Sequence, residues 1–162
     1  MAVSVNGMIA KSNDDTSWLS STEWDSYSLA VRNAGCLIIG RRTYEILTKQ
    51  PEFSEFQDVK VVVVSQTDVQ LLSQNHFRAN SPKSALSLVA EFEQVIVAGG
   101  GKLDAAFMEE KLIDEIYLDI EPIAIGQGIS VFEGKNFDCK LKFLGQKMIS
   151  ENVVQLHYEV LK

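Results

Sequence analysis

Features that would place this 162-residue chain in several classes of protein are rare or missing. It has only two cysteines, Cys36 and Cys139, which stand alone without a C-x-x-C pair or a histidine cluster. This excludes a disulfide framework and gives no support for a metal site. No apolar run approaches the ~20 residues of a membrane span, and no charged-then-apolar leader opens the chain. We therefore expect a protein of the reducing cytoplasm with no membrane segment.

Positive charge is also scarce. The chain has 15 Lys and Arg residues against 22 Asp and Glu residues, a formal net charge of −7. This balance disfavours binding to nucleic acid or to an anionic membrane, because both need a basic surface. An anionic ligand would have to be bound locally, by backbone amides, helix N-termini and a few arginines. At this length we expect one domain, residues 1–162, with a core that needs no cross-links.

The most informative stretch is the run of three glycines at 99–101. Before it, Val95–Ala98 has the brevity and β-branched character of an interior strand, and from Leu103 onward apolar residues recur at helical spacing. Glycine lets a ligand approach the backbone, and the first amides of the new helix have no partner within it. The pattern predicts a phosphate-binding turn, with a plain strand-to-helix turn as the alternative.

Two common phosphate-binding fingerprints are not matched here. A P-loop would need glycine in place of Ile96 and Ser or Thr in place of Leu103. A G-x-G-x-x-G begun at Gly99 meets Asp104 where its last glycine belongs. The rest of the chain must therefore decide between a ligand-binding turn and a structural one.

Two other predicted strands end in residues suited to phosphate. Cys36–Ile39 runs into Gly40–Thr43, which carries two arginines and a threonine at the start of a helix, and Val59–Val64 ends in Ser65 and Gln66. Arginine forks bind phosphate oxygens well, although such residues also occur in a solvated first helical turn. Because ligands bind outside the carboxyl ends of strands in open α/β sheets, three such ends together favour a nucleotide.

The order of predicted elements indicates the fold class. Strands alternate with helices up to about residue 112, and the chain then ends in a hairpin of Leu141–Ile149 with Val153–Leu161. We expect a three-layer α/β/α domain with a central mixed, mainly parallel sheet and a C-terminal antiparallel hairpin. His76 stands alone and is interpreted as a structural or surface residue.

A helix predicted from Ser20 supplies the best candidate acid. Ser20 and Glu23 have the spacing of a capping box, and an apolar stripe begins with Trp24 and Tyr27. Glu23 falls on the edge of this stripe, so its carboxylate could face a cleft. We interpret it as a capping partner, a catalytic group or both. Trp18, just before this helix, is interpreted as a core residue or as the lip of a pocket.

Taken together, these motifs resemble the dihydrofolate reductase-like fold family, and within it the reductase domain of riboflavin biosynthesis. The resemblance covers nearly the whole chain. Ser4–Ala10 is similar to the opening S-x-D-G-x-I-A, with Asn6 in place of the usual Asp, and Gly40–Tyr44 is similar to G-R-x-T-[WY]. Ala98–Gly101 resembles the loop for the nicotinamide cofactor.

The most specific part of the resemblance follows the glycine-rich helix. Leu112–Leu118, then Glu121–Gly128 and Phe132, are similar to L-x-D-E-[IL]-x-L…P-x-x-[IL]-G-x-G…F of the riboflavin-type reductase domain. The resemblance implies a reductase that uses NADPH to reduce a small heterocyclic or ribosylated substrate. It also implies a homodimer through the late strands and a cis peptide bond between Gly99 and Gly100.

The resemblance also assigns site residues. The cofactor-binding set it implies comprises Ile9, Ala10, Gly40, Arg41, Thr43, Ser65, Gln66, Ala98, Gly99, Gly100, Gly101, Lys102 and Leu103. Ile9 and Ala10 would flank the nicotinamide, and the glycines would hold the diphosphate. Asn6 and Trp18 would contact substrate, and Glu23, five positions after Trp18, matches the spacing of the acidic residue of dihydrofolate reductases.

These assignments lead to three functional hypotheses. The first is reduction of a ribosylaminouracil phosphate, as in riboflavin biosynthesis, and the second is reduction of dihydrofolate. The third, from a different class, is a module that binds NADPH without turning it over. No metal ion and no macromolecular partner other than a second copy is expected.

Overall fold

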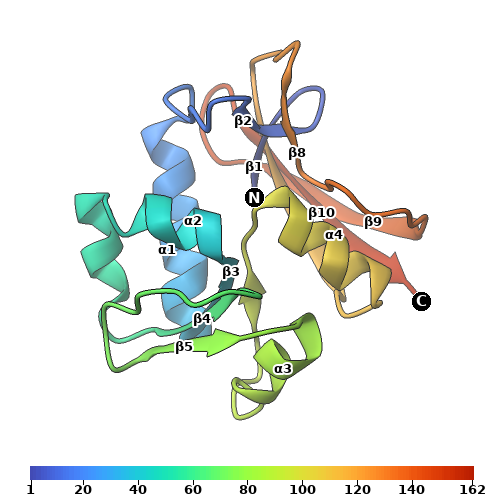
Figure 1. The fold of residues 1–162 in the computed structure, drawn as a ribbon. Helices are drawn as coiled ribbons and strands as arrows, with labels where there is room; N and C mark the ends of the chain where they lie inside the picture. The colour runs from blue at the N-terminus through green and yellow to red at the C-terminus, as the bar shows by residue number, and fades with distance from the viewer.

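The structure is a computed structural model that describes residues 1–162 as an α/β fold (Figure 1). In chain order its elements are β1 (Ala2–Ser4), β2 (Met8–Lys11), α1 (Ser21–Ala34), β3 (Cys36–Gly40), α2 (Arg41–Leu47), the 3₁₀ helix η1 (Pro51–Phe56), β4 (Lys60–Val64), β5 (His76–Ala79), α3 (Pro82–Ser87), β6 (Ile96–Val97), α4 (Gly101–Glu109), β7 (Glu115–Glu121), β8 (Gly128–Ser130), β9 (Lys140–Met148) and β10 (Val154–Leu161). No helix combines the length and the apolar character needed to cross a bilayer.

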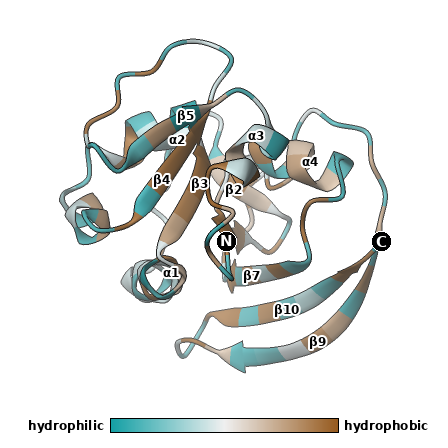
Figure 2. Ribbon diagram, turned by 90° about the horizontal axis from the view of Figure 1, so that it is seen from below, coloured by the Kyte–Doolittle hydropathy of each residue, from teal (hydrophilic) through white to brown (hydrophobic).

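The first sheet is entirely parallel, in the order β5-β4-β3-β6. Its central strands are rich in Ile and Val, and Figure 2 shows both β3 and β4 as mostly hydrophobic. Because side chains alternate across a strand, Leu37 and Ile39 enter one core cluster, whereas Cys36 and Ile38 enter another. Helices therefore have to cover both faces of this sheet.

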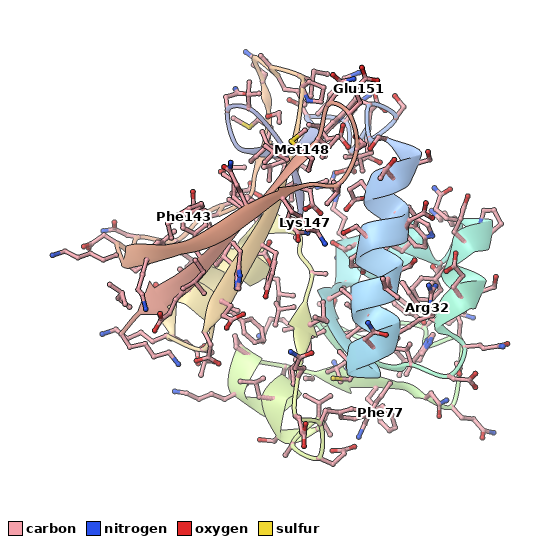
Figure 3. The ribbon with its side chains drawn as sticks, turned by 180° about the vertical axis from the view of Figure 1, so that it is seen from behind. Arg32, Phe77, Phe143, Lys147, Met148 and Glu151 are labelled. Carbon is pink, nitrogen blue, oxygen red and sulfur yellow. The ribbon has the colours of Figure 1, made fainter.

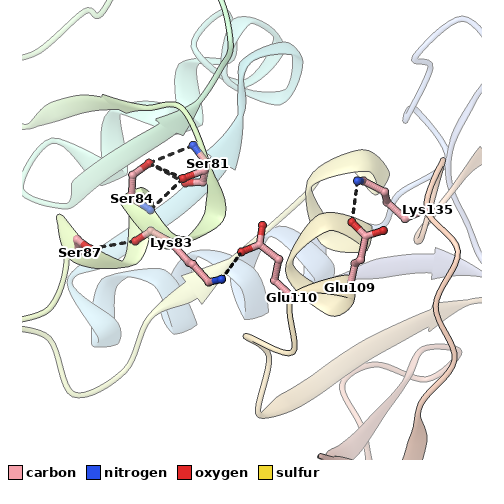
Figure 4. Close-up of polar contacts among 7 residues, drawn as sticks. All are labelled: Ser81, Lys83, Ser84, Ser87, Glu109, Glu110 and Lys135. Carbon is pink, nitrogen blue, oxygen red and sulfur yellow. Dashed lines mark hydrogen bonds and ion pairs between the residues drawn. The ribbon is translucent and has the colours of Figure 1, made fainter.

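The helices form the two outer layers. Val31 of α1, Tyr44 of α2 and Phe56 of η1 pack into the first core cluster. Ala85 of α3 and Phe107 of α4 pack into the second. Figure 4 shows how α3 begins with a capping box between Ser81 and Ser84, and how Lys83 reaches Glu110 just beyond α4 at 3.6 Å. The expected three-layer α/β/α arrangement is confirmed.

The second sheet contains both parallel and antiparallel pairs, in the order β1-β7-β10-β9. β1 runs parallel to β7, and the C-terminal hairpin of β9 and β10 is antiparallel, as predicted. Strand pairing does not cross from β6 to β1, so the mixed sheet is divided into two sheets of four strands. β6 has only two residues before the chain turns into the glycine run, which leaves no length for further pairing.

A short antiparallel ribbon of β2 and β8 lies above this junction. Gly128 opens β8 and approaches the carbonyl of Ala10 closely. A Cβ at Gly128 would lie 2.4 Å from that carbonyl oxygen, so only glycine allows this approach. The η1 helix was not anticipated from the sequence.

Candidate functional site

Three strand ends suited to phosphate meet at one edge of the parallel sheet. β4, β3 and β6 are neighbours, with Gly40 opposite Val64 and Ile38 opposite Val97. The N–H of Ala98 continues this pairing by donating to the Ile38 carbonyl at 3.0 Å. Because the strands are parallel, their carboxyl ends reach the same edge. The sequence-based grouping of these ends is therefore confirmed.

The two glycine junctions are joined directly. The Gly40 N–H donates to the carbonyl of Gly99 at 2.8 Å. Gly99 has a φ of +79°, which other residues rarely adopt, and the Gly99–Gly100 peptide bond is cis, as the family resemblance implied. A Cβ at Gly40 would lie 3.6 Å from the Gly99 carbonyl oxygen, so the two glycine turns are in van der Waals contact here.

The glycine loop, residues 99–101, leads directly into the first turn of α4 and has backbone N–H groups without an acceptor. The carbonyl of Gly100 accepts from Leu103 and Asp104, whereas the N–H of Gly100 has no acceptor in the protein. The first N–H groups of a helix have no acceptor within the helix, and Lys102 here has an exposed side chain. These features make the loop suitable for an anionic group.

Two side chains from other elements approach Gly100. A Cβ at Gly100 would lie 3.4 Å from Oγ1 of Thr43, in α2, and 3.9 Å from Cδ1 of Ile9, in β2. Ala10, next to Ile9, is buried and pairs with Ile129 of β8. The structure thus brings Ile9, Thr43 and the glycine loop to one place, from three separate elements.

The two arginines of α2 have different surroundings. Arg42 donates through Nε and Nη2 to the carboxylate of Asp14, in the loop that follows β2. Arg41 is half-exposed and has only Glu45 near it, at 3.9 Å. Of the two arginines, Arg41 is therefore the one that remains available for a ligand, which the sequence alone did not decide.

Other predicted cofactor residues have structural contacts. The Ser65 hydroxyl donates to the Thr67 carbonyl at 2.6 Å, and the side chain of Gln66 donates to the Asn80 carbonyl. Both follow β4 at the carboxyl edge of the parallel sheet. Leu103 lies in the core beneath the loop, and its N–H is bonded to Gly100. Its contacts are therefore those of a core residue.

Gly101 is confined by β8. A Cβ at this position would lie 2.0 Å from the carbonyl oxygen of Ser130 and 3.2 Å from Cβ of Glu133. The carbonyl of Gly101 in turn accepts from the Glu133 N–H at 3.0 Å. Glycine is required here by packing against β8, in addition to any contact with a ligand.

The predicted capping box of α1 is wrong. Ser20 makes no side-chain capping bond, because its hydroxyl and its N–H both donate to the carboxylate of Glu121, at 2.7 and 3.1 Å. Glu23 is therefore not a capping partner. Its carboxylate makes no hydrogen bond, although the residue is only 8% exposed. The catalytic role inferred for Glu23 stays a prediction.

Glu23 lies in an acidic cluster with Asp119 and Glu121, which are buried residues of β7. Asp119 accepts from the amide of Gln155 at 2.7 Å, and Glu121 accepts from Ser20. Burial raises the pKa of Glu23 to about 7; the terminal ammonium opposes this shift, and the charges of Asp119 and Glu121 reinforce it. An acid with this pKa can hold a proton near neutral pH and release it.

The two predicted substrate-binding residues have internal partners. Asn6 accepts from the Ser4 hydroxyl and the Ile125 N–H, and it donates to the Ile125 carbonyl at 2.8 Å. An aspartate could not make the last of these bonds, which explains the asparagine at this position. Trp18 is half-buried and donates to the Asp15 carbonyl at 3.2 Å.

Three buried acidic residues near the site were missed by the sequence analysis: Asp104, Asp119 and Glu121. Those of β7 alternate with apolar residues, a pattern typical of a strand with one exposed face. In fact the start of α1 covers this face at the end of β7, where Ser20 donates to Glu121 and Glu23 lies near both carboxylates.

His76, interpreted as structural or surface, is buried and hydrogen-bonded to the Tyr44 hydroxyl at 2.8 Å.

Comparison with solved structures shows the same fold in reductase domains. A protein from Shewanella assigned provisionally to riboflavin biosynthesis aligns with 100% of this chain and 97% of its own, with a TM-score of 0.81 and 19% identity. Acinetobacter baumannii RibD aligns over 99% of this chain, with a TM-score of 0.79 and 16% identity. This chain spans 56% of that longer protein.

Sequence comparison finds relatives of similar length. The uncharacterized protein YwjB of Bacillus subtilis is 30% identical over 164 residues, which cover 98% of this chain and 94% of YwjB. The uncharacterized protein YyaP of the same organism is 21% identical and is covered to 91%. The family model described as RibD C-terminal domain matches residues 1–155. The chain therefore belongs to the RibD C-terminal domain family.

Proposed function

We propose that this protein is an NADPH-dependent reductase that reduces a C=N or C=O bond of a small heterocyclic or ribosylated acceptor. The observation that carries the proposal is the junction of two glycine turns through the Gly40–Gly99 hydrogen bond, beside unpaired backbone donors. Family membership supports the same conclusion, because reductase domains of this fold use a nicotinamide cofactor. The free cysteines are compatible with a reducing cytoplasm.

The residues present fit such a cofactor. The unused N–H of Gly100 and the exposed Lys102 would hold the diphosphate, and Arg41 would meet the additional phosphate of NADPH. Ile9, which approaches Gly100, would border the cofactor on its nicotinamide side, and the Thr43 hydroxyl, which also approaches Gly100, would lie beside its phosphates. When bound, NADPH would supply a hydride to the acceptor. The protein would contribute orientation, a dry site and a proton.

Glu23 is the proposed proton source. Glu23 is 8% exposed and its carboxyl has no hydrogen-bond partner in the protein, so it is free to bond to an acceptor. With a pKa raised to about 7 by burial, it can deliver a proton at neutral pH as the hydride arrives. Ser20 and Gln155 fix the neighbouring carboxylates of the acidic cluster, which in turn favour the protonated form of Glu23.

Two acceptors are proposed, in order. Reduction of a ribosylaminouracil phosphate comes first, on the family resemblance. Reduction of dihydrofolate comes second, and one observation favours it. The acidic cluster contains three carboxylates, whereas Lys11, at the end of β2, is paired with Asp15 at 2.7 Å. A substrate phosphate would therefore have little positive charge to bind.

The test is consumption of NADPH by the purified protein with each acceptor in turn. We expect the wild type to oxidise NADPH with at least one of them, and Glu23→Gln to lower kcat by about 10²-fold or more, since positioned acid catalysis has this magnitude. NADPH affinity should stay unchanged in this variant. Binding of NADPH without turnover of any acceptor would instead support a non-catalytic NADPH-binding module.

We also propose that the protein is a homodimer formed through the late strands. β9 is an edge strand, and its apolar residues are open to solvent: Phe143 is 55% exposed and Met148 is 61% exposed. Figure 3 shows both residues on β9, with no helix over this strand in that view. An exposed apolar edge strand of this length is normally covered by a partner.

A further inference from the structure

Asp104 is a buried carboxylate that the proposed reductase mechanism does not use. It lies in the first turn of α4 and is only 8% exposed. One oxygen, Oδ1, accepts from the N–H of Gly99 at 3.0 Å. Since the Gly99 carbonyl accepts from Gly40, this bond links α4 to both glycine junctions. Asp104 therefore fixes the peptide on which the geometry of the loop depends.

The second oxygen of Asp104 has no partner. Oδ2 is fully buried without any hydrogen bond, 3.7 Å from the position that a Cβ of Gly99 would occupy. A buried and unpaired carboxylate oxygen is costly, and protonation removes most of that cost. Burial raises the pKa of Asp104 to about 7, although the Gly99 N–H and the terminal ammonium both act to lower it.

The location of this carboxylate conflicts with an anionic ligand. A diphosphate on the glycine loop would bring further negative charge to the turn that contains Asp104. The terminal ammonium before β1 is the only charged group that acts on Asp104 from outside α4; no charged side chain of β3, β6 or α2 does so. Ligand binding would therefore add negative charge beside Asp104, and the terminal ammonium is the one charged group that offsets it.

We propose that Asp104 is the positioning residue of the glycine loop and that it takes up a proton when the anionic dinucleotide binds. The inference rests on the proposed function, because it requires NADPH on the loop. In the protonated state Oδ1 still accepts from Gly99, so the loop keeps its shape while the charge is removed. Cofactor affinity is then coupled to pH through a residue that is not the proposed acid, Glu23.

The test is isothermal titration calorimetry with NADPH at pH 7 in two buffers of different ionisation enthalpy. If Asp104 is about half protonated before binding and fully protonated after it, the wild type should take up about half a proton more per site than Asp104→Asn. Asparagine can keep the bond to Gly99 but cannot titrate. Asp114→Asn, which removes an exposed carboxylate paired with Lys162, should behave as the wild type.

A second readout is the dependence of NADPH affinity on pH. Because only protonated Asp104 favours the bound state, wild-type affinity should fall about tenfold between pH 7 and pH 8.5, and that of Asp104→Asn should stay nearly constant. Equal proton uptake and equal pH dependence in the two proteins would overturn the inference. If Asp104→Asn does not fold, the wild type alone provides the test, and NADPH binding without proton uptake would overturn the inference. Failure of the wild type to bind NADPH at all would instead contradict the proposed function.

Discussion

The Ser20 hydroxyl donates a 2.7 Å hydrogen bond to the carboxylate of Glu121, and this contact joins the start of α1 to the end of β7. It removes Ser20 from helix capping and leaves Glu23 without a partner. The acidic cluster is therefore stabilised by a contact between two residues that are 101 positions apart in the sequence. Its arrangement follows from tertiary contacts rather than from the local helix.

Replacement of Ser20 by alanine tests this contact. We expect Ser20→Ala to lower the free energy of unfolding by about 1–2 kcal/mol, because a charge-assisted hydrogen bond to a buried carboxylate is lost. Urea denaturation of Ser20→Ala, Glu121→Gln and the double variant should give a coupling energy of about 1 kcal/mol. An equal cost of Ser20→Ala in both backgrounds would mean that Ser20 acts only on its own helix.

The pH dependence of stability tests the burial of Glu23. The folded-state pKa of about 7 lies above the ordinary value of 4.5, so the folded protein binds this proton more tightly than the unfolded chain. The contribution of Glu23 to stability is therefore present below about pH 4.5 and is lost as the pH rises towards 7. Relative to the wild type, Glu23→Gln should gain about 2 kcal/mol in unfolding free energy between pH 5 and pH 8.

The control for this measurement is Asp25→Asn, since Asp25 is an exposed carboxylate on the same helix. Its stability relative to the wild type should not change with pH. If Glu23→Gln shows no trend either, Glu23 is accessible to water in solution, and its assignment as a proton-holding acid loses support.

Much of the fold could be predicted from the sequence because it depends on short-range pattern. The Ile- and Val-rich strands next to glycine turns, as at Gly40 and Gly99, identified three strand ends that meet in space. The apolar stripe that begins with Trp24 and Tyr27 correctly predicted the face of α1 that packs on the sheet. Such patterns can be recognised in the sequence because the burial of apolar side chains determines their spacing directly.

The polar details could not be predicted in the same way. Ser20 has the local pattern of a helix cap, but a buried carboxylate from β7 competes for its hydroxyl. Asp104 occupies the place of a glycine in a common fingerprint, and only the folded chain shows its bond to Gly99. Such contacts join residues that are distant in sequence or depend on backbone turns, so no single-sequence pattern specifies them.

Gly101 offers a test of the packing between α4 and β8. Gly101→Ala would place a Cβ 2.0 Å from the Ser130 carbonyl oxygen, so the backbone of β8 must move. We expect a loss of about 2–4 kcal/mol in unfolding free energy. Gly145→Ala is the matched control, because no atom lies within 4 Å of its added Cβ. Equal stability of the two variants in urea would contradict this packing.

The proposed homodimer predicts a response of β9 to charge. Phe143→Lys and Met148→Lys place a charge on exposed apolar positions of the edge strand, and we expect both to convert a dimeric wild type into a monomer in light-scattering measurements. Phe77→Lys is the control, since Phe77 is exposed on β5 in the other sheet. A wild type that is monomeric at micromolar concentration would rule out this partner.

The central claim, that the glycine loop and Arg41 bind NADPH, is tested most directly by titration with NADPH and NADH while the fluorescence of Trp18 and Trp24 is followed. The account predicts that NADPH binds at least about tenfold more tightly, a difference of about 1.4 kcal/mol. Arg41→Ala should abolish this preference, and Arg42→Ala, which breaks the pair with Asp14, should keep it. Binding of neither cofactor, or equal affinity for both in all three proteins, would contradict the claim.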